Sequence, residues 1–316
     1  MPEKRTKKSS QNKKKSYLIG VDGGGTKTVA ALADFNGRIL KMARAGPASP
    51  RNVRPEIAAE NVAQAIKKVL RKGRVLSTFI GLAAVEEQPR LGWQFKKEIL
   101  KRKKISQVLE GKVAIGSDQI VAFRAGTEEK DGVLIIAGTG CIVRGWRGDK
   151  EARAGAWGWL NDEGSAFWTG QKVFQAIFRD LDERGSKTMM TNLAFKELKA
   201  KNISEFLTRV YSERIMEIVP LFSIIADKAS KKGDKVARKI LKEAGEELAL
   251  STKMVIKKLG FGSKEFPLVL VGGMFKSKIV LATVKEEIKK IAPGAKFIRL
   301  RKEPVIGAVK LALENL

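Results

Sequence analysis

The chain has 316 residues, of which 43% are hydrophobic and 30% are charged, and its formal net charge is +28. This length is typical of two domains, since single cores seldom grow beyond about 250–300 residues. The chain contains no histidine and one cysteine, which excludes a Ser-His-Asp triad, a histidine-ligated zinc, an imidazole base and an internal disulfide.

Residues 1–16, MPEKRTKKSSQNKKKS, are rich in lysine and contain no apolar run, so they are predicted to form a disordered basic tail and not a signal peptide. No stretch of about eighteen apolar residues follows, which favours a cytoplasmic protein without membrane contact. The lysines are spread over predicted helices with few aromatic residues between them. We therefore expect nucleic acid to bind only through nonspecific charge.

After the tail, residues 17–22 are predicted to form a buried strand that enters a glycine-rich loop. Two further strands, at 29–34 and 38–45, are separated by Asn-Gly, which is a strong hairpin signal. Pro55 stands where a helix would begin. The elements expected next are a strand at 78–84, a basic amphipathic helix at 93–103 and a strand at 112–118.

The same order then recurs, with a strand at 133–138, a glycine turn and a strand at 141–146. Residues 164–260 are predicted to be mostly helical. The recurrence of strand, glycine turn and strand suggests two similar halves. The last elements expected are a strand at 268–273, a helix at 277–291, a strand at 296–300 and a helix after Pro304.

The stretch GVDGGGTKT, at 20–28, holds the densest glycine cluster in the chain. It does not match the Walker pattern, because Thr26 precedes Lys27, and it lacks the last glycine of the dinucleotide pattern, because Thr28 stands there. Both patterns also require a helix behind the loop, whereas a strand is predicted here. Glycines between antiparallel strands can present N–H groups to an anion, so this loop is predicted to be a phosphate-binding β-hairpin.

A second glycine turn, IAGTGC at 136–141, also lies between two predicted strands, and VGGM at 271–274 follows a third. One such turn alone could be a tight hairpin that binds nothing. Two turns at corresponding places favour phosphate binding, and VGGM is a candidate for contact with adenine.

Six segments, DGGGTKT, GSD, IAGTG, GAWGWLNDEGS, LVLVGG and EPVIGA, resemble the successive motifs of N-acetylglucosamine kinase and its relatives in the BadF/BadG/BcrA/BcrD ATPase group. This group is part of the actin-like ATPase, hexokinase and Hsp70 superfamily. The resemblance covers residues 17–316 and implies an α/β protein with two ribonuclease-H-like domains and an interdomain cleft. The N-terminal domain would comprise residues 17–124, joined by the last helix at 304–316, and the C-terminal domain residues 125–303.

The resemblance also implies that ATP and Mg²⁺ bind. Asp22 would hold Mg²⁺ through water, while the glycine turns would contact the phosphates and the adenosine. The residues implied to bind the nucleotide are Gly24, Gly25, Thr26, Lys27, Gly138, Thr139, Gly140, Gly272 and Gly273.

Asp118 matches the catalytic base of the family. The chemistry supports that role, because a sugar hydroxyl that attacks the γ-phosphate must lose a proton to a positioned group and the chain offers no histidine for it. The alternative is that Asp118 only caps the following helix. The residues implied to contact the acceptor are Asn52, Asp118, Thr139, Trp157, Gly158 and Asp162.

Two of these interpretations have a plain structural alternative. Asn52 could be an ordinary surface turn residue, and Trp157 could fill a core together with Trp159, as tryptophan more often does. Glu163 is expected to cap the following helix, where a carboxylate suits the helix dipole.

Three departures from the family pattern affect the acceptor and phosphate segments. Asn161 replaces the glycine of GDEGS, and Ala84 and Glu86 stand where glycine and aspartate are usual. Cys141 stands where serine is usual, and its small size is compatible with an unchanged phosphate turn.

The function predicted from these residues is ATP-dependent phosphorylation of a hydroxyl of an amino sugar or hexose, by a homodimer. One alternative is an activator ATPase of a dehydratase or reductase, which holds an iron–sulfur cluster between subunits and needs more thiolates than one cysteine per chain supplies. Another is a non-catalytic nucleotide-dependent sensor or nucleic-acid-binding protein.

Overall fold

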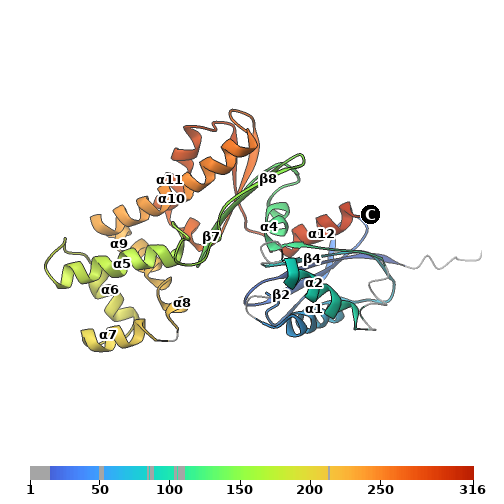
Figure 1. Ribbon diagram of the computed structural model, residues 1–316, viewed down its shortest axis with the longest axis horizontal. Coiled ribbons are helices and arrows are strands. Elements are labelled where there is room, and N and C mark those ends of the chain that lie inside the picture. The colour runs from blue at the N-terminus through green and yellow to red at the C-terminus, as the bar shows by residue number, and fades with distance from the viewer. Residues whose placement is uncertain are drawn as a thin grey trace, which may run out of the picture. The chain divides into compact units, whose positions relative to one another are not determined.

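The computed structural model describes residues 15–49, 53–83, 85, 89–102, 105, 111–212 and 214–316. The chain divides into two compact units (Figure 1): unit 1 comprises residues 1–125 and 302–316, and unit 2 comprises residues 126–301. Each unit contains one five-stranded sheet and several helices, which confirms the predicted α/β class. Among the described residues, no helix is long and apolar enough to cross a membrane.

The sheet of unit 1 is built from β1 (Ser16–Gly23), β2 (Thr28–Ala33), β3 (Ile39–Ala45), β4 (Arg74–Leu82) and β5 (Lys112–Ser117). The strand order is β3-β2-β1-β4-β5. β2 pairs antiparallel with both β1 and β3, so the predicted hairpins are confirmed, while β4 and β5 continue the sheet in parallel.

Helices cover both faces of this sheet. They are α1 (Pro55–Val69), α2 (Pro89–Leu100), α4 (Asp118–Gly126) and α12 (Val305–Glu314). Ile19 and Val21 of β1 belong to a core that includes residues of α1 and α2, whereas Leu18 belongs to a core with residues of α4 and α12. Because β1 is buried on both faces, its sequence is a continuous apolar run. This packing on both faces positions the end of β1, from which the glycine loop starts.

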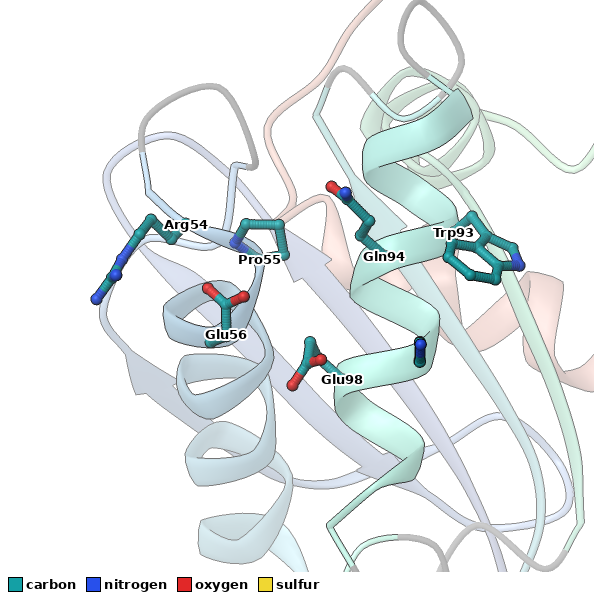
Figure 2. Close-up of a pocket in the computed structure, with 7 residues that line it drawn as sticks. Arg54, Pro55, Glu56, Trp93, Gln94 and Glu98 are labelled. Carbon is teal, nitrogen blue, oxygen red and sulfur yellow. The ribbon is translucent and has the colours of Figure 1, made fainter.

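A hollow of about 370 Å³ lies between the start of α1 and α2 (Figure 2). The side chains of Arg54 and Trp93 point away from one another there, while Glu98 extends from α2 toward α1 and Glu56 lies at the first turn of α1. None of the site residues predicted from the sequence lines this hollow. It is therefore not the basis of the candidate site.

The sheet of unit 2 is built from β6 (Gly132–Ala137), β7 (Cys141–Arg147), β8 (Lys150–Gly155), β9 (Phe266–Val271) and β10 (Ala295–Arg299). Its order is β10-β9-β6-β7-β8. β7 pairs antiparallel with β6 and β8, and β9 and β10 continue in parallel from β6. Strand by strand this repeats the topology of unit 1, which confirms the prediction of two similar halves.

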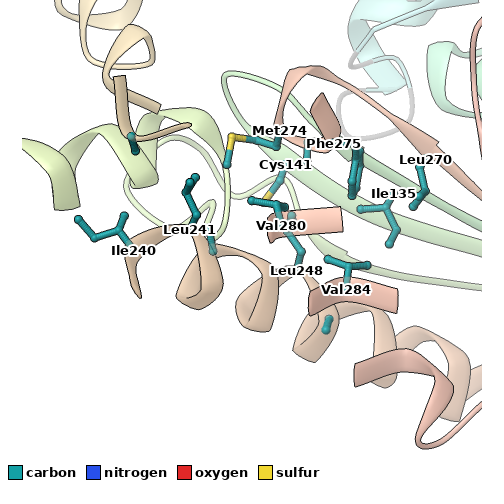
Figure 3. Close-up of a cluster of buried hydrophobic side chains, with 14 of the residues drawn as sticks. Ile135, Cys141, Ile240, Leu241, Leu248, Leu270, Met274, Phe275, Val280 and Val284 are labelled. Atoms are coloured by element: carbon teal, nitrogen blue, oxygen red, sulfur yellow. The ribbon is translucent and has the colours of Figure 1, made fainter. Parts of the chain in front are cut away.

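Unit 2 also contains α5 (Ala166–Leu181), α6 (Met190–Glu197), α7 (Ile203–Val210), α8 (Ile215–Ile218), α9 (Leu221–Lys231), α10 (Lys235–Leu259), the 3-10 helix η1 (Gly273–Lys276) and α11 (Lys278–Lys289). Asp234 caps the start of α10 by accepting from the N–H of Ala237, and Gly260 ends the helix in the left-handed conformation. Side chains of α10 and α11 meet those of β6 and β9 in one core that includes Cys141 (Figure 3).

Candidate functional site

The first glycine turn joins β1 to β2 as predicted, with strand pairing up to Gly23 and Thr28. The N–H of Gly24 donates to the carbonyl of Lys27 at 3.0 Å and closes the turn. The carbonyl of Gly24 accepts from Ala48 at 3.0 Å and from Ser49 at 3.2 Å, so a second segment braces the turn. A strand follows the loop and no helix does, which separates this turn from both familiar nucleotide loops.

Gly23 and Gly24 are glycines for different reasons. A Cβ at Gly23 would lie 2.5 Å from Cδ2 of Leu82, so packing inside unit 1 requires glycine there. A Cβ at Gly24 would lie 3.4 Å from the carbonyl oxygen of Lys27, which is an ordinary van der Waals contact, and Gly24 is not among the glycines with positive φ. Since the fold tolerates a side chain at Gly24, close approach of a ligand is the physical reason left for this glycine.

Asp22 lies at the end of β1 and is half-buried. The pKa of its carboxyl group is raised to about 7, mainly by burial and then by the negative charge of Asp118. The positive charge of Lys27 lowers this pKa, and the negative charge of Glu303 adds to the increase. The strand register agrees, because Asp22 pairs with Gly81 of β4 and Gly81 pairs with Gly116 of β5, two residues before Asp118. The structure therefore brings the two predicted aspartates, Asp22 and Asp118, together beside the turn.

We expect Asp22→Asn to stabilise the protein in the absence of nucleotide and divalent cations. The pKa of Asp22 is about 7 in the folded chain, against a reference value of 3.8, so folded chains bind more protons between these values and wild-type stability falls as pH rises from about 4 to about 7. Asparagine does not ionise, so the variant avoids this decrease in the free energy of unfolding, which is roughly 1–2 kcal/mol after allowance for solvent screening.

The measurement is urea unfolding in the presence of a chelator at several pH values between about 5 and 8. The advantage of Asp22→Asn should grow up to about pH 7 and then stay level, as the pKa of Asp22 requires. Asp149→Asn, at an exposed position of unit 2, is the matched control and should follow the wild type. An advantage that is the same at every pH would contradict the raised pKa.

Asp118 is the first residue of α4 and directly follows β5. The hydroxyl of Ser117 accepts from the N–H of Ile120 at 3.4 Å, which is the side-chain capping contact of this helix. Ser117 therefore occupies the cap position that the simpler interpretation gave to Asp118. The expected cap of α5 at Glu163 is wrong, because Ser165 holds that position and accepts from the N–H of Trp168 at 3.2 Å.

The second glycine turn joins β6 to β7 in unit 2, again as predicted. The N–H of Gly138 donates to the carbonyl of Gly140 at 2.9 Å, and the carbonyls of Gly138 and Thr139 accept from Ala166 and Phe167 in the first turn of α5. A Cβ at Gly138 would meet no atom within 4 Å, and Gly138 is not among the glycines with positive φ. As at Gly24, neither packing nor backbone conformation requires glycine at Gly138, which leaves close approach of a ligand as the reason for it.

Asp162 lies against this turn with only 6% of its surface exposed. Its Oδ2 accepts from the N–H of Cys141 at 3.4 Å and would lie 2.5 Å from a Cβ at Gly140. Burial raises its pKa, and backbone N–H groups of Cys141 and of 156–158 lower it. These N–H groups lie near the carboxylate, but within the described part of the chain none of them forms a hydrogen bond of normal geometry with its buried Oδ1. A ligand hydroxyl would satisfy such an atom.

The tryptophans of the loop between β8 and α5 do not fill the core. Trp157 is 67% exposed and lies under the guanidinium of Arg153, 4.9 Å from its ring centroid, so the alternative of a core role is wrong for Trp157. Trp159 is 43% exposed and packs against Phe167 at 5.0 Å between ring centroids. Gly158, between them, has φ 106°, so the chain turns there in a conformation that suits glycine.

The glycine pair after β9 lies beside the second turn. Gly272 has φ 112°, and a Cβ there would lie 2.2 Å from the carbonyl oxygen of Ala137, which directly precedes Gly138. A Cβ at Gly273, in contrast, would meet no atom within 4 Å. Packing therefore requires glycine at Gly272, whereas Gly273 leaves open space next to the turn.

One residue beside the first glycine turn, Glu303, was not predicted from the sequence. Glu303 lies just before α12 and forms ion pairs with Lys27 and Arg44. Its segment, EPVIGA, resembles a family motif, but nothing in that segment indicates a partner 276 residues away. Asn52, Ala84 and Glu86 lie outside the described residues.

The family model of the BadF/BadG/BcrA/BcrD ATPase family matches residues 19–312. The chain is 30% identical to N-acetyl-D-glucosamine kinase of Dictyostelium discoideum, over 95% of this chain and 99% of that protein. It is 29% identical to N-acetylmuramic acid/N-acetylglucosamine kinase of Clostridium acetobutylicum, over 94% and 98% of the two chains.

Two solved structures share the fold. A proposed N-acetylglucosamine kinase of Chromobacterium violaceum has a TM-score of 0.71 at 21% identity and covers 94% of this chain and 98% of its own. A ROK family glucokinase of Streptomyces griseus, in complex with glucose and AMPPNP, has a TM-score of 0.57 at 18% identity, with 94% and 99% covered.

Proposed function

Because the chain belongs to the BadF/BadG/BcrA/BcrD ATPase family, we propose that it is an ATP-dependent kinase that phosphorylates a hydroxyl of an amino sugar or related hexose. The observation that carries this proposal is that Asp22 and Asp118 lie at the ends of β1 and β5, on either side of β4, beside a glycine turn whose Gly24 is not required by packing. The two named kinases that match nearly the whole chain support the same reaction class.

In unit 1, Asp22 would hold Mg²⁺ through water, while Gly24, Gly25, Thr26 and Lys27 would contact phosphate oxygens. The donor set fits that ion, because Mg²⁺ keeps several waters and uses one or two carboxylates together with phosphates. The described residues contain no group of three or more acidic or cysteine side chains that would form a protein cage. Mg²⁺ would supply positive charge against the phosphates.

Asp118 is proposed as the general base. A new bond forms between the sugar oxygen and the γ-phosphorus, the bond from that phosphorus to the oxygen bridging to the β-phosphate breaks, and ADP leaves. The hydroxyl proton passes to the carboxylate of Asp118. Such a step needs mainly positioning and charge stabilisation, which residues at the ends of buried strands can provide.

In unit 2, Gly138, Thr139 and Gly140 would form the second phosphate turn, and Gly272 and Gly273 would lie against adenosine. The acceptor contacts would come from Asn52, Thr139, Trp157, Gly158 and Asp162. The unsatisfied Oδ1 of Asp162 supports a hydroxyl ligand, and the exposed ring of Trp157 offers a flat apolar surface of the kind that suits a sugar. We also propose that the kinase acts as a homodimer.

The activator ATPase is the weaker candidate for a further reason. Cys141 is 9% exposed, its Sγ lies 3.1 Å from the carbonyl oxygen of Glu163, and burial raises its pKa to about 12. Cluster ligation requires the thiolate. A thiol in this environment is poorly suited to hold iron.

The test is ADP release with MgATP and a panel of hexoses, N-acetylhexosamines and anhydro-sugars. A kinase should release ADP well above the sugar-free rate with at least one member, and phosphate should appear on that sugar. If no sugar stimulates release while the protein binds DNA with an affinity that falls by about 0.9 log units per log unit of salt for each phosphate neutralised, the nucleic-acid alternative replaces the kinase.

A further inference from the structure

Glu303 forms two ion pairs that join three segments of unit 1. Its Oε1 accepts from the guanidinium of Arg44 on β3 at 2.7 Å, and its Oε2 lies 3.5 Å from Nζ of Lys27 in the first glycine turn. Glu303 itself stands just before α12. A carboxylate from the far end of the sequence therefore lies over the turn that is proposed to hold phosphate.

The two contacts differ in strength. The Arg44 contact is a short charge-assisted hydrogen bond, whereas the Lys27 contact is long for a hydrogen bond. Both cations are exposed, Lys27 at 47% and Arg44 at 64%, so the difference between them lies in the length of the contact. The flexible Lys27 side chain can move to another anion while the shorter bond keeps Glu303 on Arg44.

The backbone and the side chain of Lys27 have different roles in the turn. Its carbonyl closes the turn with the N–H of Gly24, so its backbone is fixed beside Gly24. Its ammonium group is the positive charge within this turn, and it is held by Glu303 in the ligand-free protein. Phosphate oxygens arriving at Gly24 would compete with Glu303 for the same ammonium group.

We propose that Glu303 is a positioning residue that holds Lys27 in the ligand-free protein and yields it to the phosphates of the nucleotide. This inference rests on the proposed function. Nucleotide binding then has to replace an existing ion pair, so Glu303 weakens binding and hastens the release of ADP. Loss of its charge frees Lys27 and also removes a negative charge near Asp22.

Replacement of Glu303 is expected to strengthen nucleotide binding and not to weaken it. A residue that only supports the fold should weaken nucleotide binding when it is replaced. Glu303→Gln should instead tighten the binding of MgADP by about two- to fivefold at low salt, which corresponds to an exposed ion pair, and the gain should shrink at high salt. Glu303→Asp, which keeps the charge, should stay close to the wild type.

The experiment is calorimetric titration of MgADP, without sugar, into the wild type, Glu303→Gln, Lys27→Ala and the double variant. The gain from Glu303→Gln should be clearly smaller in the Lys27→Ala background, as coupling between the two side chains requires, because only the effect of the removed charge on Asp22 and the phosphates is left there. Glu129→Gln, at an exposed position of unit 2, makes the same change in net charge and should leave the affinity unchanged. Circular dichroism checks that each variant is folded.

Weaker or unchanged binding in folded Glu303→Gln would overturn the inference, and so would a gain of the same size in the Lys27→Ala background. These outcomes leave the kinase proposal standing, because the wild type still binds MgADP. If the wild type itself does not bind MgADP, both the inference and the nucleotide site fail.

Discussion

Replacing Asp118 with asparagine is expected to lower sugar-dependent turnover by about 10²–10⁴-fold, the usual contribution of a positioned general base. Asparagine keeps the shape of the side chain but cannot accept the proton of the attacking hydroxyl. Ser117 still provides the capping contact of α4, so the helix should keep its start. The measurement is kcat and KM for the sugar identified in the screen, together with the affinity for MgADP.

Nucleotide affinity separates loss of the base from loss of the site. The charge of Asp118 raises the pKa of Asp22, so Asp118→Asn favours the ionised form of Asp22. Binding of MgADP should therefore be unchanged or slightly tighter while turnover is lost. Asp149→Asn makes the same chemical change at an exposed position and should retain full turnover. Wild-type turnover in Asp118→Asn would remove Asp118 from the role of base.

The glycine turns were predictable from the sequence because their strands are distinctive. β1 and β6 are apolar runs, and a glycine cluster follows each of them before another strand begins. The spacing excluded the two loops that need a helix behind them. The residue types and their order along the chain were therefore enough to predict the hairpins and the repeated topology.

β8 (Lys150–Gly155) shows where such reasoning stops. Its sequence, KEARAG, has little apolar content, and the strand lies at the edge of its sheet with half-exposed residues. Charged residues protect edge strands against aggregation, and they remove the apolar signal by which strands are recognised. No strand was predicted there for this reason.

The candidate site was only partly predictable because sequence spacing does not report distance in space. Glu303 reaches Lys27 from 276 residues away, and only the packing of α12 against the sheet brings them together. The exposure of Trp157 and the capping role of Ser117 are likewise consequences of local packing. The glycines of the pairs 23–24 and 272–273 look alike in sequence. They differ in what a Cβ would meet, and only Gly272 of these four has a positive φ.

Gly138→Ala is expected to weaken MgADP binding by roughly 10–100-fold, as an added methyl group in a close contact does, and to leave the fold intact. In the ligand-free protein the new methyl group would meet no atom within 4 Å, and the backbone at this position is not in the left-handed region. Alanine also restricts the unfolded chain, so stability should be equal or slightly higher. A bound phosphate is the object that the methyl group would displace.

The measurement pairs thermal unfolding with titration of MgADP, and Gly272→Ala provides the contrast. Its Cβ would lie 2.2 Å from the carbonyl oxygen of Ala137 at φ 112°, so that variant should lose stability whether or not a nucleotide binds. Loss of affinity without loss of stability in Gly138→Ala therefore identifies a contact with the ligand. Wild-type affinity in folded Gly138→Ala would show that the second turn is a plain hairpin that holds no phosphate.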